Sequence, residues 1–157
     1  MEPNIGLSST NLSNVAHALN KILADEFVLY TKTRNAHWNV EGPDFHAKHL
    51  FFERQYQQLD EIMDGVAERI RSLGHYAPAT LKLFSELTQL SEVLHSKNDA
   101  TGFIKELLVD HESIIIGLRE NINVFANNFK DLGTSDYITG LMETHEKMAW
   151  MLRSHLK

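Results

Sequence analysis

The chain has 157 residues, no cysteine and a formal net charge of −6. Its length predicts a single domain over residues 1–157, in which residues 1–10 form a flexible N-terminal tail. The lack of cysteine excludes disulfides, thiolate metal sites and cysteine nucleophiles. No apolar stretch is long enough to span a membrane, and the first residues lack a signal-peptide pattern, so we expect a cytoplasmic protein.

The first half of the chain predicts two long helices joined by a tight turn. Apolar residues recur at helical spacing over residues 11–39, and residues 8–11 offer side chains that can cap the start of this helix. The turn contains Gly42, and a second helix is expected over residues 43–73, with Pro43 in its first turn. Gly74 is a suitable residue to end it.

The second half predicts a short helix and two more long ones. Thr80 can cap a short helix that contains Leu81, Phe84 and Leu87. Long helices are expected over residues 101–128 and 135–155, with a turn between them. No segment alternates in the manner of a strand. The predicted fold is therefore all-α, a four-helix bundle with a short extra helix in the crossover between helices two and three, which is the ferritin-like arrangement.

The second helix carries a stripe of polar side chains that metals can use. His49, Glu53, Asp60, Asp64 and Glu68 follow one another at separations of four, seven, four and four residues. At about 100° per residue they fall within an arc of roughly 100°. The spacing alone favours an ordinary solvated face, so further evidence is needed for a metal site.

Two histidines provide that evidence. His37 stands shortly before the turn at Gly42 and His49 shortly after it. In an antiparallel hairpin with a rise of about 1.5 Å per residue, the two imidazoles therefore lie at similar heights. With Glu53 one turn beyond His49, they form a better metal candidate than a lone histidine does.

The carboxylates of the stripe fall into two groups, which lie too far apart in one chain to bind the same metal ion. Glu53 and Asp64 are eleven residues apart, or about 16 Å along a helix. If two copies of the helix pack antiparallel about a two-fold axis, His37, His49 and Glu53 of one chain face the second group, Asp64 and Glu68, of the other. This ligand set suits iron, although zinc also binds histidine and carboxylate.

Other arrangements of metal ligands are less well supported. A di-iron site inside one bundle needs Glu-x-x-His motifs on two helices. The chain has one such motif, at residues 92–95, in its least regular stretch, and we interpret it as accidental. The zinc-protease pattern His-Glu-x-x-His is absent.

Two motifs resemble those of a known family, the DNA-binding proteins from starved cells (Dps). The run HWNVEGPDF at residues 37–45, followed by His49, resembles the first signature of this family, and MDGVAERI at residues 63–70 resembles the second. The run HEKMAWM at residues 145–151 is similar to its last helix. The resemblance extends over nearly the whole chain.

The resemblance implies a function. Members of the family form hollow shells of twelve subunits with ferroxidase centres at two-fold interfaces. They oxidise Fe(II), preferentially with hydrogen peroxide, and store the ferric mineral, which protects the cell from oxidative damage. The resemblance implies that His37, His49, Glu53, Asp64 and Glu68 are the iron ligands. Many members have aspartate where Glu53 stands, so we expect a changed affinity rather than a lost function.

Three residues outside the ligand set are candidates for further roles. Trp38 could intercept a stray oxidising equivalent, although packing at the interface is the simpler interpretation. The family has acidic pores near the start of the last helix, where Asp131 and Asp136 occur. The simpler interpretations are a turn aspartate for Asp131 and an aspartate in the first turn of the helix for Asp136.

Two other functions compete with the ferroxidase shell. A nucleoid-binding protein with secondary iron binding is the main alternative, but the first lysine or arginine is Lys21, so DNA binding through the tail is not expected. A plain helical interaction protein is the second alternative, and it would bind no iron.

Overall fold

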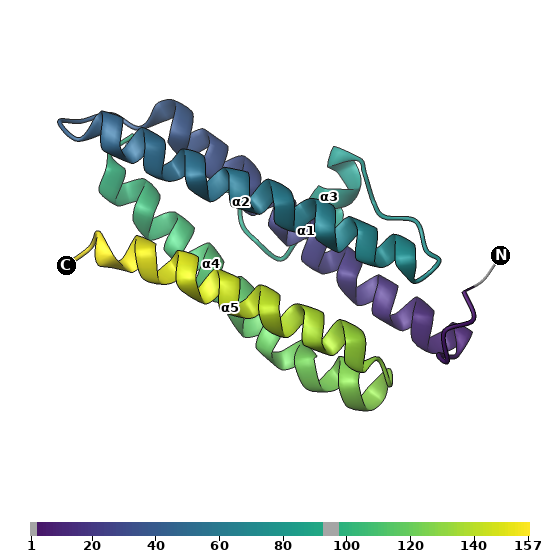
Figure 1. The fold of residues 1–157 in the computed structure, drawn as a ribbon. Coiled ribbons are helices and arrows are strands. Elements are labelled where there is room, and N and C mark those ends of the chain that lie inside the picture. Colours follow the sequence, from purple (N-terminus) through teal and green to yellow (C-terminus); the bar gives the residue numbers. More distant parts are fainter. Residues whose placement is uncertain (1–2, 93–97) are drawn as a thin grey trace.

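The computed structural model describes residues 3–92 and 98–157, which form an all-helical bundle. Figure 1 shows α1 and α2 as one antiparallel pair, α4 and α5 as the other, and a crossover carrying α3 between them. The predicted fold class is confirmed. The helices are α1 (Ser9–Asn39), α2 (Phe45–Ser72), α3 (Leu81–Leu87), α4 (Ala100–Asn123), the π-helix η1 (Val124–Asn128) and α5 (Leu132–Ser154).

The ends of the first three helices follow from local chemistry. The Ser8 side chain accepts a hydrogen bond from the backbone N–H of Asn11 and caps α1, and Thr80 caps α3 in the same way through Leu83. Gly74 has a φ of 85°, a left-handed conformation that suits the end of α2. The prediction that Pro43 lies in the first turn of α2 was wrong, because Asp44 has a non-helical conformation and the helix begins at Phe45.

The second half departs from its predicted boundaries in two places. In the helix expected over residues 101–128, the α-helical part α4 ends at Asn123 and the π-helix η1 follows from Val124. The N–H of Phe129 donates to the carbonyl of Val124 at 3.1 Å, the i to i+5 bond of a π-helix. The last helix begins at Leu132 rather than at residue 135, because Asp131 caps it by accepting a hydrogen bond from the N–H of Thr134.

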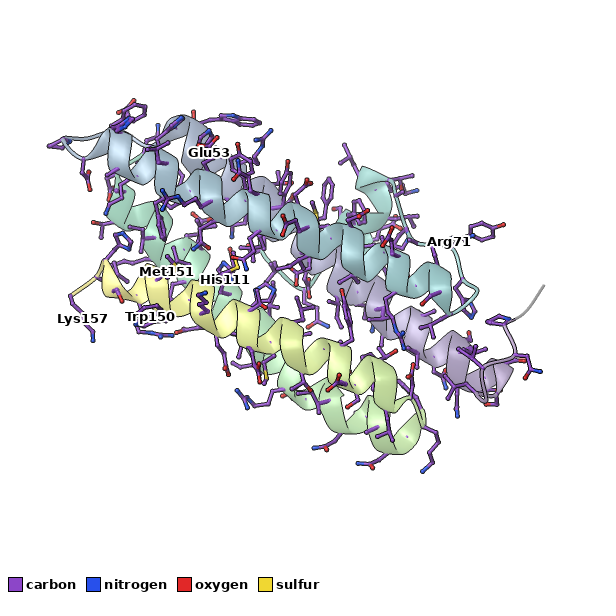
Figure 2. The ribbon with its side chains drawn as sticks, viewed as in Figure 1. Glu53, Arg71, His111, Trp150, Met151 and Lys157 are labelled. Carbon is purple, nitrogen blue, oxygen red and sulfur yellow. The ribbon has the colours of Figure 1, made fainter. Side chains whose placement is uncertain are left out.

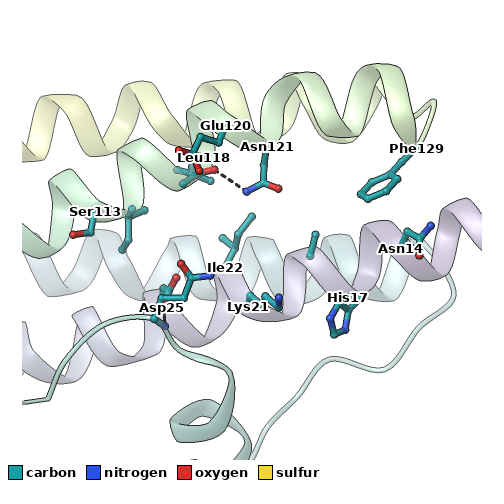
Figure 3. A pocket seen from close by; sticks show the side chains of 14 residues that line it. Asn14, His17, Lys21, Ile22, Asp25, Ser113, Leu118, Glu120, Asn121 and Phe129 are labelled. Atoms are coloured by element: carbon teal, nitrogen blue, oxygen red, sulfur yellow. Dashed lines mark hydrogen bonds between the residues drawn. The ribbon is translucent and has the colours of Figure 1, made fainter.

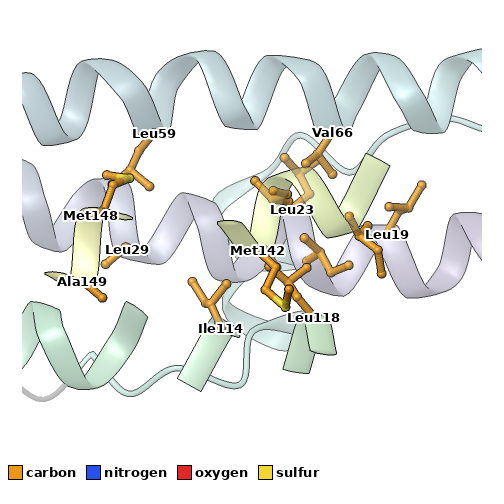
Figure 4. Close-up of a cluster of buried hydrophobic side chains, with 14 of the residues drawn as sticks. Leu19, Leu23, Leu29, Leu59, Val66, Ile114, Leu118, Met142, Met148 and Ala149 are labelled. Atoms are coloured by element: carbon orange, nitrogen blue, oxygen red, sulfur yellow. The ribbon is translucent and has the colours of Figure 1, made fainter. Parts of the chain in front are cut away.

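The core lies between the two helix pairs and consists mainly of apolar side chains that recur at helical spacing. Phe45 and Leu81, which share that spacing, are exposed instead. Burying one core side chain contributes about 1.5–3 kcal/mol, so this layer dominates the favourable side of folding. No helix in the described part of the chain is long and apolar enough to cross a membrane. Figure 4 shows core residues from all four long helices, including Leu19, Leu23, Leu29, Leu59, Val66, Ile114, Leu118, Met142, Met148 and Ala149.

A buried lysine attaches the crossover to the bundle. The Lys32 Nζ atom donates to the backbone carbonyl of Ser91 at 2.9 Å, and it pairs with Asp110 at 2.6 Å and Glu106 at 3.0 Å. Burial raises the pKa of Asp110, an effect that the neighbouring Lys32 opposes. The crossover is also held by Asp25, which accepts hydrogen bonds from the side chain of Thr88 and the backbone of Gln89.

A second buried polar group connects three helices. His145 Nε2 on α5 donates to Glu26 Oε1 on α1 at 2.9 Å, and His145 Nδ1 lies 2.9 Å from Nδ1 of His111 on α4. All three side chains are buried. Burial, and then the neighbouring His145, lowers the pKa of His111 well below its usual value, so this imidazole is neutral at neutral pH.

Candidate metal centre

The structure brings together the two histidines that flank the first turn. His37 lies in the last turn of α1 and His49 in the first part of α2, and their rings stack with centroids 3.7 Å apart and an interplanar angle of 24°. His37 is buried and His49 is half-buried. The similar heights that the hairpin predicted for these side chains are therefore observed.

Reciprocal hydrogen bonds fix how the two rings are oriented. His37 Nδ1 donates to the backbone carbonyl of His49 at 2.9 Å, and His49 Nδ1 donates to the carbonyl of His37 at 2.8 Å. A carbonyl oxygen can only accept, so each Nδ1 carries the proton. In the neutral imidazole, both Nε2 atoms then keep a lone pair, which is the form that binds metals.

Glu53 shares a helix with His49. It lies one turn beyond His49 on α2, near the hairpin end of the bundle (Figure 2), and is half-buried. The hydroxyl of Tyr56 donates to Glu53 Oε1 at 3.4 Å, and the edge of the Tyr56 ring packs against His37 with centroids 5.1 Å apart. His37, His49 and Glu53 thus form one half of the predicted ligand set, which we call the histidine half-site.

Asp64 and Glu68 form the other half, the acidic half-site. Both are exposed on α2, one turn apart. Within the described residues of one chain, no three histidine, aspartate or glutamate side chains lie close enough together to hold a metal ion. This applies to the histidine half-site as well: the structure stacks His37 on His49 but does not bring Glu53 close enough to complete a three-ligand cluster with them. The structure also does not bring the two half-sites of one chain together, so a complete ligand set needs groups from outside the chain.

The donor atoms of the two half-sites fit iron. Two neutral imidazole nitrogens and one carboxylate on one side, with two carboxylates on the other, give a mixed nitrogen and oxygen set without sulfur. The Nδ1 hydrogen bonds hold the imidazoles in the tautomer that ligation requires. The same donors also bind zinc, so the geometry fits a divalent first-row metal, and the choice of iron rests on further evidence.

The two aspartates that were proposed for a pore occupy different environments. Asp131 is buried, and its carboxylate caps α5 through Thr134 and lies 3.5 Å from the Arg69 guanidinium. This agrees with the interpretation of Asp131 as a turn aspartate and leaves little of its carboxylate for a passing ion. Asp136 is exposed on α5, and its role in a pore stays a prediction. The interpretation of Asp136 as a first-turn aspartate was wrong, because α5 begins at Leu132 and its first turn contains no acidic residue.

Trp38 adds no ligand to the candidate centre. Trp38 is 65 % exposed, and the Arg34 guanidinium lies 5.0 Å from the centroid of its ring. Residues 93–97 lie outside the described part of the chain, and so the motif interpreted as accidental falls mostly there.

A cavity of about 400 Å³ between α1 and α4 lies apart from these half-sites (Figure 3). Its walls carry charges of both signs, from Lys21 and Glu120 among others, and Asn121 on its rim donates to the carbonyl of Gly117 at 2.7 Å. None of the predicted ligands lines it. The cavity therefore does not define the chemistry of the candidate centre.

Comparison with known proteins identifies the class and then the family. The family model of the ferritin-like domain matches residues 16–157, which places the chain among ferritin-like proteins. The chain is 37% identical to DNA protection during starvation protein 2 of Bacillus anthracis, over 90% of this chain and 96% of the relative. It is also 42% identical to an uncharacterized low temperature-induced protein of Nostoc sp. PCC 7120, over 98% of this chain and 86% of that relative.

Solved structures agree with these relatives. The Dps protein of Vibrio cholerae, described as a member of a broad superfamily of ferritin-like diiron-carboxylate proteins, superposes with a TM-score of 0.92 at 30% identity, over 99% of this chain and 97% of that one. A Dps protein from Bacillus brevis gives 0.88 at 30% identity, over 96% and 100%. The chain belongs to the Dps family, as the two sequence signatures predicted.

Proposed function

We propose that this protein is a ferroxidase that stores iron in a shell of identical subunits, with each iron centre shared between two chains. The observation that carries the proposal is the pair of His37 and His49, whose Nδ1 atoms are held by backbone carbonyls so that both Nε2 atoms stay available. The acidic half-site lies on the same face of α2 but about 16 Å away, so a second chain must complete the centre.

A two-fold axis across α2 supplies the missing ligands. Antiparallel packing of two α2 helices sets the histidine half-site of one chain opposite the acidic half-site of its partner, and symmetry makes two equal centres per dimer. By family membership, twelve such chains form the shell. The acidic side chains are exposed in the single chain, as residues that act at an interface must be before assembly.

The ligands suit the chemistry of iron oxidation. Neutral imidazoles bind Fe(II) without first losing a proton, and anionic carboxylates favour the ferric product. Hydrogen peroxide is the proposed oxidant: two Fe(II) ions each give one electron, the O–O bond breaks, and two protons from solvent complete two water molecules. Because both electrons are available together, no hydroxyl radical is released. The words diiron-carboxylate and DNA protection in the descriptions of relatives support this protective role.

Anaerobic loading of the assembled protein with Fe(II), followed by one pulse of hydrogen peroxide, tests the proposal. We expect rapid oxidation of about two irons per peroxide with little trapped radical, since each peroxide takes two electrons. The double variant Asp64→Ala with Glu68→Ala serves as the matched control, because it removes only exposed side chains. Slow oxidation with abundant radical in the unmodified protein would remove the ferroxidase proposal.

DNA binding is the second candidate, favoured by the description of the Bacillus anthracis relative as a DNA protection protein. Protection of DNA does not require contact with it, since removal of iron and peroxide protects equally. The net charge of −6 opposes attraction to phosphate, so any contact would need a local basic patch. An electrophoretic shift assay at low and at physiological salt separates the two functions, and we expect no shift at physiological salt.

A further inference from the structure

A group of aromatic side chains surrounds one arginine beside the histidine half-site. Tyr30, Arg34 and Trp38 follow one another at intervals of four residues on α1, and Tyr56 faces them from α2. The Arg34 guanidinium carbon lies 4.2 Å from the centroid of the Tyr56 ring, 5.0 Å from that of Trp38 and 5.7 Å from that of Tyr30. These distances are within the range of cation–π attraction.

Tyr56 contacts two members of the histidine half-site at once. Its hydroxyl donates to Glu53 Oε1 at 3.4 Å, and its ring meets the His37 ring edge-on, at 5.1 Å and 74°. Tyr30 packs edge-on against the Tyr56 ring, with the two centroids 6.1 Å apart. The Tyr56 ring is therefore restrained by Arg34, His37 and Tyr30, and its hydroxyl is held beside the carboxylate of Glu53.

The contact with Tyr56 restricts the conformational freedom of the Glu53 side chain. Compared with aspartate, Glu53 has one more methylene and one more rotatable bond, so it loses more conformational freedom when it is held in one orientation. A hydrogen bond from the i+3 residue of the same helix restricts that freedom before the metal arrives. The cation over the Tyr56 ring draws electron density from the phenol and makes its O–H a stronger donor.

We infer that Tyr56 is a positioning residue that orients Glu53 for the metal, and that Arg34 holds Tyr56 in place. The inference rests on the proposed function, because it assigns Glu53 to the metal centre. Tyr56 itself does not bind the metal. Its hydroxyl reduces the number of orientations of the Glu53 carboxylate. We therefore expect Tyr56 to raise the affinity for the metal, an effect that can be measured without iron oxidation.

Binding of cobalt(II) in the absence of oxygen and peroxide tests the inference without measuring turnover, because the metal is then not oxidised. We expect Tyr56→Phe to weaken cobalt binding to the assembled protein about tenfold and to change its visible absorption spectrum, since loss of an outer hydrogen bond alters ligand orientation. Arg34→Gln should also weaken cobalt binding, by a smaller factor of about threefold, because it acts on Glu53 only through Tyr56. Tyr30→Phe is the matched control, because it removes a hydroxyl from the same aromatic group and should leave both signals unchanged.

A double-mutant cycle with Glu53→Asp separates positioning from general packing. The shorter side chain places its carboxylate out of reach of Tyr56, so adding Tyr56→Phe to Glu53→Asp should change the cobalt affinity by less than about twofold. An equal loss in both backgrounds, or an unchanged affinity of the single variant Tyr56→Phe, would overturn the inference while leaving the ferroxidase proposal intact. If the unmodified protein bound no cobalt at these residues, the proposed function would fail first and the inference with it.

Discussion

Replacing Lys32 with methionine removes a cation from a buried ion cluster while keeping a side chain of similar length. Lys32 is 7% exposed, and it faces Asp110 at 2.6 Å and Glu106 at 3.0 Å, whose side chains are 8% and 16% exposed. The variant leaves the Asp110 carboxylate buried without this ion-pair partner. Removing one partner of a buried ion pair costs about 3–5 kcal/mol, and we expect Lys32→Met to lower the free energy of unfolding by about that amount.

Urea unfolding at a fixed protein concentration measures this loss, with Lys21→Met as the matched control. Lys21 is exposed on the same helix, so its replacement should change stability by less than about 0.5 kcal/mol. Adding Asp110→Asn to Lys32→Met should restore at least about 1 kcal/mol, because the neutral amide needs no counter-charge. If Lys32→Met stayed within about 1 kcal/mol of the unmodified protein, the reasoning about the cluster would be refuted.

The cluster also predicts a dependence on pH. Burial raises the pKa of Asp110, so the folded state holds this proton more tightly than the unfolded state does. The contribution of Asp110 to stability is therefore greatest in acid and is lost as the pH rises through its folded pKa. Without Lys32 the pKa should rise further, and the deficit of Lys32→Met should shrink between pH 7 and pH 5; an unchanged deficit would contradict this.

Three further predictions concern the remaining features. Asp64→Ala with Glu68→Ala should leave the size of the assembly unchanged, as measured by light scattering, but slow iron oxidation at least about tenfold. Burial lowers the pKa of His111, so the unfolded state binds this proton more readily, and the free energy of unfolding should decrease as the pH drops below about 6.5, by up to about 1.4 kcal/mol per pH unit. Melting curves of His111→Gln should show a smaller decrease over the same pH range. A Cβ on Gly65 would lie 3.0 Å from the Tyr137 hydroxyl; Gly65→Ala should therefore destabilise the unmodified protein but stabilise Tyr137→Phe by up to about 1 kcal/mol in the same assay.

Features that depend on nearby residues could be predicted from the sequence. Helical spacing of apolar residues located the four long helices, and capping side chains such as Thr80 located α3. The proximity of His37 and His49 followed from one tight turn at Gly42, since the two residues are only twelve positions apart. Each of these inferences needed the geometry of a helix or a hairpin and no knowledge of distant contacts.

Features that depend on distant residues could not be predicted. Glu26 and His145 meet across 119 positions and Lys32 meets Ser91 across 59, so no local spacing marks them as partners. Lys32 follows Leu29 by three residues and precedes Ala36 by four, so its place on the apolar face of the helix is a signal in the sequence that could have indicated an internal cation. The π-helix also gave no local signal, because the helical spacing of apolar residues continues through it. The early start of α5 is different, since its cause is the local cap by Asp131.

Restoration of activity by mixing two inactive variants tests most directly whether each centre is shared between chains. One variant lacks the histidine half-site (His37→Ala with His49→Ala), the other lacks the acidic half-site (Asp64→Ala with Glu68→Ala), and the two are unfolded and reassembled together. Random pairing makes half of the dimers mixed, each with one complete centre of two, so the mixture should regain about one quarter of the unmodified oxidation rate. A mixture that stays as inactive as its components, in shells that contain both chains, would contradict the account.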